Sequence, residues 1–290
     1  MSHLLYYWRS DHYLQDLDNG VGFHLNQASP SLHKINIGES LWAFTRNKKE
    51  DYVLAAQLVI KAKTKNPPHY KYGHYRVWGD LIESRYFDIN IQKDISSIIK
   101  SFSIKTGKQS TVLGRAFQGN AAVREIQNQD HQFLFKHAKD IPQERRATLL
   151  PEDELEWLSF GESRTLVTHF LQSNPIQSVG TDRQKYLITP QRFVRNKQYR
   201  QELLEQYNGC CQITGWNPRK EYGLDLCEVH HVHWLSRGGH DEPSNLVLIS
   251  PNIHRMLHSL DVPFDYEHQY FCLNQTALPL KINKHSLLPC

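Results

Sequence analysis

The chain has 290 residues, of which 39% are hydrophobic and 22% are charged, and these proportions fit a folded protein with room for two ordinary domains. No apolar run approaches the roughly 20 residues that span a bilayer, and the first residues lack the apolar core of a secretory signal. These features exclude a membrane span and predict a cytoplasmic protein. The net charge of +4 is compatible with a polyanionic partner but is weak evidence for one.

Residues 1–138 have the pattern of a mixed α/β domain with many short strands. Aromatic and β-branched residues predict strands over 41–45, 52–60, 75–80 and 85–89. The charged stretch at 47–51 between the first two strands has the composition of a hairpin tip. Isoleucines at 95, 98 and 99 indicate a helix over 94–102, and a second helix is predicted over 128–138.

Residues 139–190 are predicted to form a helical connector that is punctuated by prolines. One helix begins at Pro151, because the acidic residues that follow suit the positive end of the helix dipole. A second short helix is predicted over 163–171. The second domain then covers residues 191–290 and starts with a helix over 192–207, which ends at Asn208 and Gly209.

The last third of the chain carries the most informative pattern. His230 and His231 are adjacent, Asn245 follows, and His254 and His258 are four residues apart. On a strand the first pair points to opposite faces, so one imidazole can reach a metal while its neighbour reaches a water. On a helix the second pair shares one face. Imidazoles suit divalent transition ions and can support Mg²⁺ chemistry, so the pattern indicates a one-metal phosphodiesterase.

Residues 200–262 resemble the HNH nucleases, and the closing His-x-x-x-His also resembles the colicin DNases. Four motif elements match in order and spacing, and they are Tyr207–Gly215, Cys227–His231, Gly238-Gly239 with Asn245, and Pro251–His254. The resemblance implies a ββα-metal fold, in which a β-hairpin, a loop and a helix surround one divalent ion. Mg²⁺, Mn²⁺, Ni²⁺ and Zn²⁺ are not distinguished by the residues.

The resemblance also implies a role for each residue. His231 would be the general base, since a free imidazole pKa near 6.5 lies close to working pH. His230 and His254 would bind the metal, and His258 would either be a third ligand or pack beneath the site. The side chain of Asn245 would hydrogen-bond the backbone across the loop and hold His231 in place.

The cysteines depart from the pattern of many HNH proteins, which hold a structural zinc with two cysteine pairs. Thr214 and Ser250 stand where two of the thiolates would be needed, and both are poor zinc ligands. We therefore expect no structural zinc. The hairpin would instead be held by packing, with a predicted core of Trp216, Leu224, Leu226 and Trp234.

The N-terminal segments Tyr7–Ser10 and Ile37–Phe44 resemble the PUA-like domains, including the EVE and ASCH types. That resemblance implies a small β-barrel whose pocket reads a modified base flipped out of a duplex. Such a pocket needs aromatic walls and a few polar groups. The candidates are Trp8, Tyr75 and Trp78 for the walls, and Asp11, Asn26, Gln27 and Asp80 for the base edge. Each of these aromatic residues is more often plain core.

These observations predict an α+β protein with a PUA-like β-barrel domain and helices at 1–138, a helical connector at 139–190 and an HNH nuclease domain at 191–290. The predicted function is a metal-dependent endonuclease of double-stranded DNA, of restriction type and directed to methylated or hydroxymethylated cytosine. A homing or repair nuclease and a non-catalytic DNA-binding protein are the alternatives, and a homodimer is left open. Candidate phosphate contacts are Arg192, Arg195, Lys197 and Arg237, which could also be solvated.

Overall fold

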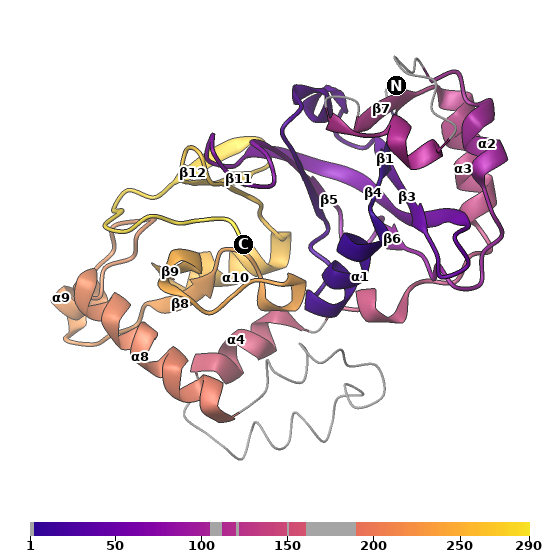
Figure 1. Cartoon of the computed structure of the whole chain (residues 1–290). Helices are drawn as coiled ribbons and strands as arrows, with labels where there is room; N and C mark the ends of the chain where they lie inside the picture. The colour runs from indigo at the N-terminus through magenta and orange to yellow at the C-terminus, as the bar shows by residue number, and fades with distance from the viewer. Residues whose placement is uncertain (1–2, 105–111, 120–121, 150, 161–189) are drawn as a thin grey trace. The chain divides into compact units, whose positions relative to one another are not determined.

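The computed structural model describes residues 3–104, 112–119, 122–149, 151–160 and 190–290 (Figure 1). The side chains at 154, 157–159 and 190–197 are outside the description. The chain divides into two compact units. The first comprises Met1–Leu17 and Gly22–Thr148, and the second comprises Asp18–Val21 and Leu149–Cys290. Within the described ranges, no helix combines the length and apolar character needed to cross a bilayer.

A sheet of seven strands forms the centre of the first unit, in the order β2-β5-β4-β3-β1-β7 with β6 paired to β4. The strands are β1 (His3–Tyr7), β2 (His24–Gln27), β3 (Ser40–Arg46), β4 (Tyr52–Lys65), β5 (Tyr75–Gly79), β6 (Arg85–Tyr86) and β7 (Val123–Ile126). β1 and β3 are parallel and the other pairings are antiparallel. The four predicted strands are confirmed as β3, β4, β5 and the short β6.

The long strand β4 connects the two ends of this sheet. It pairs with β3 along its first half and with β5 along its second, and the register shifts between Ile60 and Ala62. Such bulges bend a strand and increase its twist. β2 and β7 end the sheet path and do not pair with each other among the described residues. The mixed α+β class is confirmed, whereas the closed PUA-like barrel is not.

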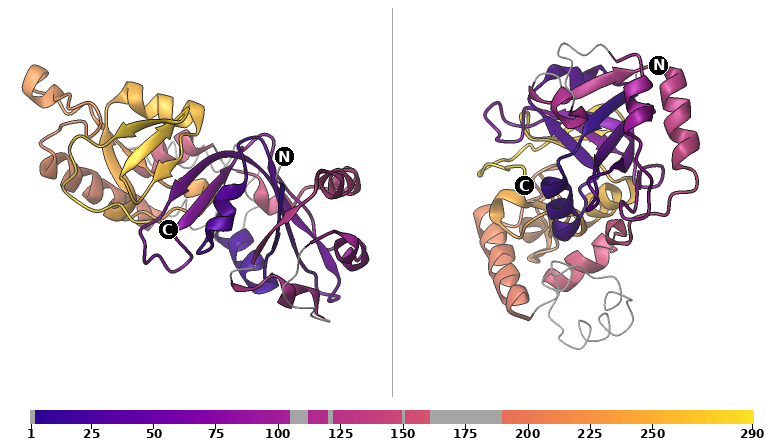
Figure 2. Two further views of the ribbon diagram at one scale, coloured as in Figure 1. Left: turned by 90° about the horizontal axis from the view of Figure 1, so that it is seen from above. Right: turned by 45° about the vertical axis from the view of Figure 1, so that its right-hand side comes forward.

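Two helices cover one face of this sheet, α2 (Ser96–Ser101) and α3 (Asn128–Ala138) (Figures 1 and 2). Ile99 of α2 and Leu134 of α3 belong to one buried cluster with Trp42 and Phe44 of β3. The predicted helices over 94–102 and 128–138 are therefore confirmed, the first being shorter than expected. A further helix, α1 (Ser10–Asn19), follows β1 directly.

The second unit combines helices with two small sheets. Its elements are α4 (Glu152–Phe160), α8 (Pro190–Gln206), α9 (Pro218–Tyr222), β8 (Glu228–His231), β9 (Leu246–Ile249), α10 (Pro251–Leu260), β10 (Phe264–Asp265), β11 (Tyr270–Leu273) and β12 (Thr276–Pro279). β8 and β9 form an antiparallel pair, and α10 follows at once. α4 packs against α8 and β8. The helix predicted over 163–171 lies outside the described residues.

The predicted core of the hairpin is wrong at two positions. Leu224 is 56% exposed and Leu226 is 41% exposed. The reason is that β8 begins only at Glu228, so both leucines lie in the loop before the strand and no paired strand covers them. Trp216 and Trp234 are half-buried. The buried apolar residues are Cys227, Val229 and all four residues of β9.

We predict that the first unit loses stability as the pH falls from about 6.5 to about 4. Trp42 Nε1 lies 3.1 Å from His131 Nδ1, which must be unprotonated to accept this hydrogen bond. Burial, and then repulsion from the stacked His3 ring, lower the pKa of His131 to about 4. The unfolded chain binds a proton near the ordinary value, so acid favours unfolding.

The measurement is urea unfolding of the first unit at pH 7 and pH 5. The His131→Gln variant keeps an acceptor for Trp42 and should reduce the loss between the two pH values by about 1–2 kcal/mol, after allowance for partial exposure. His12→Gln, at an exposed position, is the control. An unchanged pH dependence in His131→Gln would contradict the assignment.

Candidate active site

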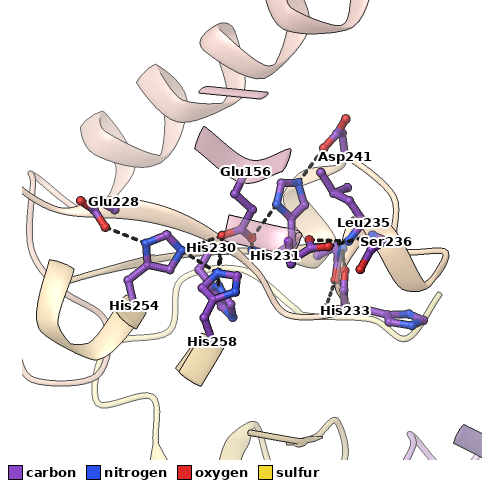
Figure 3. Close-up of polar contacts among 12 residues, drawn as sticks. Glu156, Glu228, His230, His231, His233, Leu235, Ser236, Asp241, His254 and His258 are labelled. Carbon is purple, nitrogen blue, oxygen red and sulfur yellow. Dashed lines mark hydrogen bonds and ion pairs between the residues drawn. The ribbon is translucent and has the colours of Figure 1, made fainter. Parts of the chain in front are cut away.

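Three histidines from β8 and α10 point to one place in the second unit (Figure 3). His258 Nε2 lies 3.0 Å from His254 Nε2 and 3.2 Å from His230 Nδ1. The two helical histidines are one turn apart on α10, as their spacing predicts. His230 lies on β8, whose register opposite β9 pairs it with Val247. The local sequence thus places three imidazole nitrogens around one point.

A fourth group that could hold a metal comes from α4, and it was not predicted from the sequence. Glu156 Oε2 lies 2.6 Å from His254 Nε2, 2.7 Å from His258 Nε2 and 3.4 Å from His230 Nδ1. The four donor atoms all lie within 4.8 Å of one another. Glu156 precedes His230 by 74 residues, so no spacing rule connects the two. The sequence offered one indication of its role. Glu156 and Glu152 are four residues apart on a predicted helix, so their carboxylates share one face.

The donor set fits a divalent metal ion. Three imidazoles and one carboxylate suit Zn²⁺ and other first-row divalent ions, and the buried position limits competition from water. Burial lowers the pKa of His230 to about 4, which keeps this imidazole neutral. Neutral imidazole is the form that binds metals. The structure thus brings His230, His254 and His258 together with Glu156, within 4.8 Å of one another.

A glutamate at the edge of the site orients His254. His254 Nδ1 lies 2.6 Å from Glu228 Oε2, which leaves Nε2 facing the other donors. Burial alone would lower the pKa of His254, but its hydrogen bonds to Glu156 and Glu228 raise it to about 9. The His254 bond in turn lowers the pKa of Glu228. A carboxylate on the outer nitrogen of a ligand histidine is the usual support for metal binding.

His231 lies on the other side of the same carboxylate and is fully buried. Its Nδ1 is 2.9 Å from Glu156 Oε1, and its Nε2 is 2.6 Å from Asp241 Oδ1. Burial lowers the pKa of His231, but the bonds to Asp241 and Glu156 outweigh it and raise the pKa to about 9. Asp241, which was not predicted from the sequence, orients the ring so that Nδ1 faces Glu156.

The loop between β8 and β9 is held by Asn245. Its Oδ1 accepts from His233 N at 2.8 Å, and its Nδ2 donates to the carbonyls of His233 and His240 at 2.8 and 2.9 Å. Gly238 has a φ of 93°, and a Cβ on Gly239 would lie 1.9 Å from the His233 carbonyl oxygen. Only glycine fits at these two positions. Asn245 and the glycines thus fix the loop that follows His231.

Glu152 links α4 to this loop through hydrogen bonds. Its Oε1 accepts from Leu235 N at 2.6 Å and its Oε2 accepts from Ser236 N at 2.8 Å, and the side chain is buried. Glu152 and Glu156 therefore lie on one face of α4, one turn apart. Burial, and then repulsion from Glu156, raise the pKa of Glu152. The contacts of both carboxylates show that α4 is built into the site.

The proposed phosphate contacts are placed as follows. Arg237 is buried, pairs with Asp261 and lies over the Trp234 ring at 4.2 Å. It is neither solvated nor free to approach a backbone phosphate in this arrangement. The side chains of Arg192, Arg195 and Lys197, on the first part of α8, are outside the described residues.

Four of the proposed base-pocket residues lie on the paired strands β2 and β5. Asn26 is paired with Arg76 and Gln27 with Tyr75. Trp78 is 3% exposed, and its Nε1 donates to Thr64 Oγ1 at 2.8 Å. The register places Asn26 and Trp78 on one face of the sheet and Gln27 and Tyr75 on the opposite face, so the structure does not bring the four side chains together.

The other three are placed at separate positions of the first unit. Trp8 packs edge-on against Tyr13. Asp11 forms an exposed ion pair with Arg9 at 2.5 Å. Asp80 accepts hydrogen bonds from the backbone of a turn, at residues 82 and 83. These contacts give all three residues a local structural role.

Comparisons with known proteins agree with this geometry. Residues 211–260 match the family model of HNH endonucleases. This segment is an HNH endonuclease domain. A stretch of 68 residues is 40% identical to the type IV methyl-directed restriction enzyme EcoKMcrA of Escherichia coli strain K12. That match covers 23% of this chain and 24% of the enzyme, so the chain spans about a quarter of its relative's length.

The HNH domain contains the histidines of the sequence motif and Asn245, as the sequence resemblance predicted. Glu156 and Glu152 lie outside the matched segment and reach the site from α4. The site of the HNH domain is thus completed by residues that the family model does not include.

We predict that Asn245→Ala lowers the stability of the second unit by about 2–4 kcal/mol, because three buried hydrogen bonds are lost and two carbonyls and one amide are left without this partner. The measurement is the melting temperature of the full chain. Asn283→Ala, at an exposed position, should leave it unchanged. Equal melting temperatures for Asn245→Ala and the parent would show that Asn245 does not hold the loop.

Proposed function

We propose that this chain is a metal-dependent endonuclease that hydrolyses phosphodiester bonds of double-stranded DNA. The observation that carries the proposal is the convergence of His230, His254 and His258 beside His231, within a segment that matches the HNH endonucleases. Three imidazoles make a site for one divalent ion, and a fourth imidazole adjoins it. This is the set of groups that phosphodiester hydrolysis by one metal requires.

The residues of the chain have separate tasks in this mechanism. Asp241 occupies Nε2 of His231, so the proton of an attacking water would be taken at Nδ1, which becomes available once that nitrogen has lost its own proton and Glu156 Oε1, 2.9 Å away, has withdrawn. Asp241 holds the imidazole in the orientation that the transfer needs and stabilises the imidazolium that forms. Asn245 holds the loop after His231. His230, His254 and His258 would bind the ion, which when bound stabilises charge on the phosphate and the leaving oxygen.

We predict that His231→Ala lowers the rate of DNA cleavage by at least about 100-fold, because the proton acceptor is lost. Divalent metal binding should remain, since the three proposed metal-binding histidines are untouched. The measurements are nicking of plasmid DNA with Mg²⁺ or Mn²⁺ and calorimetric titration of the metal. His268→Ala, at a half-exposed position outside the site, is the matched control. Cleavage at the parental rate by His231→Ala would refute the assignment of the base.

We further propose that the enzyme is of restriction type and that the first unit directs it to DNA with modified cytosine. The name of the matched relative, a methyl-directed restriction enzyme, supports this, although the match covers only 24% of that protein. Gln27 and Tyr75 are paired on β2 and β5 and so share one face of the sheet, where they supply an amide and an aromatic ring, which are parts of a base-reading pocket.

We predict that DNA containing methylated or hydroxymethylated cytosine is cut faster than unmodified DNA of the same sequence. Tyr75→Ala should reduce this preference, because an aromatic wall of the proposed pocket is lost. Tyr72→Ala, on an exposed turn residue, should preserve it. The measurement is cleavage of the three substrates under identical conditions. Equal cleavage of all three would leave a homing or repair nuclease that reads sequence or structure.

A further inference from the structure

The least expected residue of the site is Glu156, a carboxylate with 1% side-chain exposure that lies among four histidines (Figure 3). A buried carboxylate is costly unless charge or hydrogen bonds compensate it. Both of its oxygens are used. Oε2 faces His230, His254 and His258, and Oε1 accepts from the backbone N of His231 and lies beside His231 Nδ1.

The four facing atoms lie close enough together to surround one cation. Glu156 Oε2 and the three imidazole nitrogens are separated by 2.6, 2.7, 3.0, 3.2 and 3.4 Å in the five pairs measured. Ligands about 2.0–2.2 Å from a metal are about 3.0–3.5 Å apart in octahedral or tetrahedral sites. The 3.0, 3.2 and 3.4 Å separations fall in this range, whereas the two shorter ones join Glu156 Oε2 to His254 and His258, so the carboxylate would move outward by a few tenths of an ångström when an ion is bound.

Protons alone do not account for this arrangement. His258 Nε2 lies within 3.2 Å of three atoms with lone pairs, but an imidazole nitrogen carries at most one proton. A proton on each facing nitrogen would let Glu156 Oε2 accept from all three imidazoles, but it would also set the N–H of His258 against those of His254 at 3.0 Å and His230 at 3.2 Å. A cation between these atoms satisfies all of the lone pairs together.

The position of α4 is set by more than this one contact. Glu152, one turn before Glu156, accepts from two backbone N–H groups of the loop that follows β8. These two hydrogen bonds fix the position of α4, and with it the position of Glu156 beside the histidines. By contrast, Asp153 is exposed on the same helix.

We propose that Glu156 is the fourth ligand of the metal ion, supplied by α4 from outside the HNH segment, and that it closes the site in the absence of DNA. The inference rests on the metal site of the proposed function. Catalytic metal sites keep an open position, whereas sites with four protein ligands are closed. Oε2 takes the position that a phosphate oxygen would need at the metal. Oε1 lies beside Nδ1 of His231, the nitrogen that would face the attacking water.

The test is titration of the full chain with Co²⁺, followed by calorimetry and by visible absorption. Four-coordinate Co²⁺ absorbs visible light more strongly than six-coordinate Co²⁺, so the spectrum reports the number of ligands. Glu156→Gln should bind Co²⁺ at least about tenfold more weakly than the parent and show a weaker visible band. Glu156→Ala should behave in the same way, and the melting temperature of each variant checks its folding.

Two controls separate this inference from the proposed function. Asp153→Asn removes the same charge from an exposed position of α4 and should bind Co²⁺ like the parent. His254→Ala should lose most of the binding, because it removes a ligand that the metal site requires. If His254→Ala weakens binding while both Glu156 variants match the parent in affinity and spectrum, the fourth ligand is refuted and the metal site stands. If His254→Ala also matches the parent, the metal site itself is refuted.

Discussion

The second unit is organised around one buried carboxylate. Glu156 contacts His230, His231, His254 and His258, and burial of such a charge costs several kcal/mol unless these contacts compensate it. The elements that carry the five residues, α4, β8 and α10, must therefore keep their mutual positions. Glu152 contributes to this constraint, because it ties α4 to the backbone of the loop that separates the two strands of the hairpin.

Two outer carboxylates decide which nitrogen of two of the histidines faces inward. Glu228 holds Nδ1 of His254, and Asp241 holds Nε2 of His231. The two carboxylates bind opposite nitrogens of the two rings. As a result, Nε2 of His254 and Nδ1 of His231 both face Glu156. Such partners orient an imidazole and make it more basic. They give two chemically identical side chains opposite orientations, as the proposed roles of one ligand and one proton acceptor require.

Much of this site could be predicted because its rules are local. Four-residue spacing on a helix and alternation on a strand placed His254, His258 and the adjacent pair without knowledge of the rest of the chain. The same reasoning failed for Leu224 and Leu226, since an apolar residue is buried only if another element covers it. It also did not predict that the strand path of the first unit would stay open between β2 and β7 in the described residues.

The sequence by itself therefore determined the HNH segment, its histidines and Asn245, and the helices and strands that carry them. Only the tertiary structure decided that Glu156 and Asp241 complete the site. Backbone geometry repeats every few residues, so it relates neighbours along the chain. The contact of Glu156 with His230 spans 74 residues and depends on how α4 packs against β8, which periodicity does not encode.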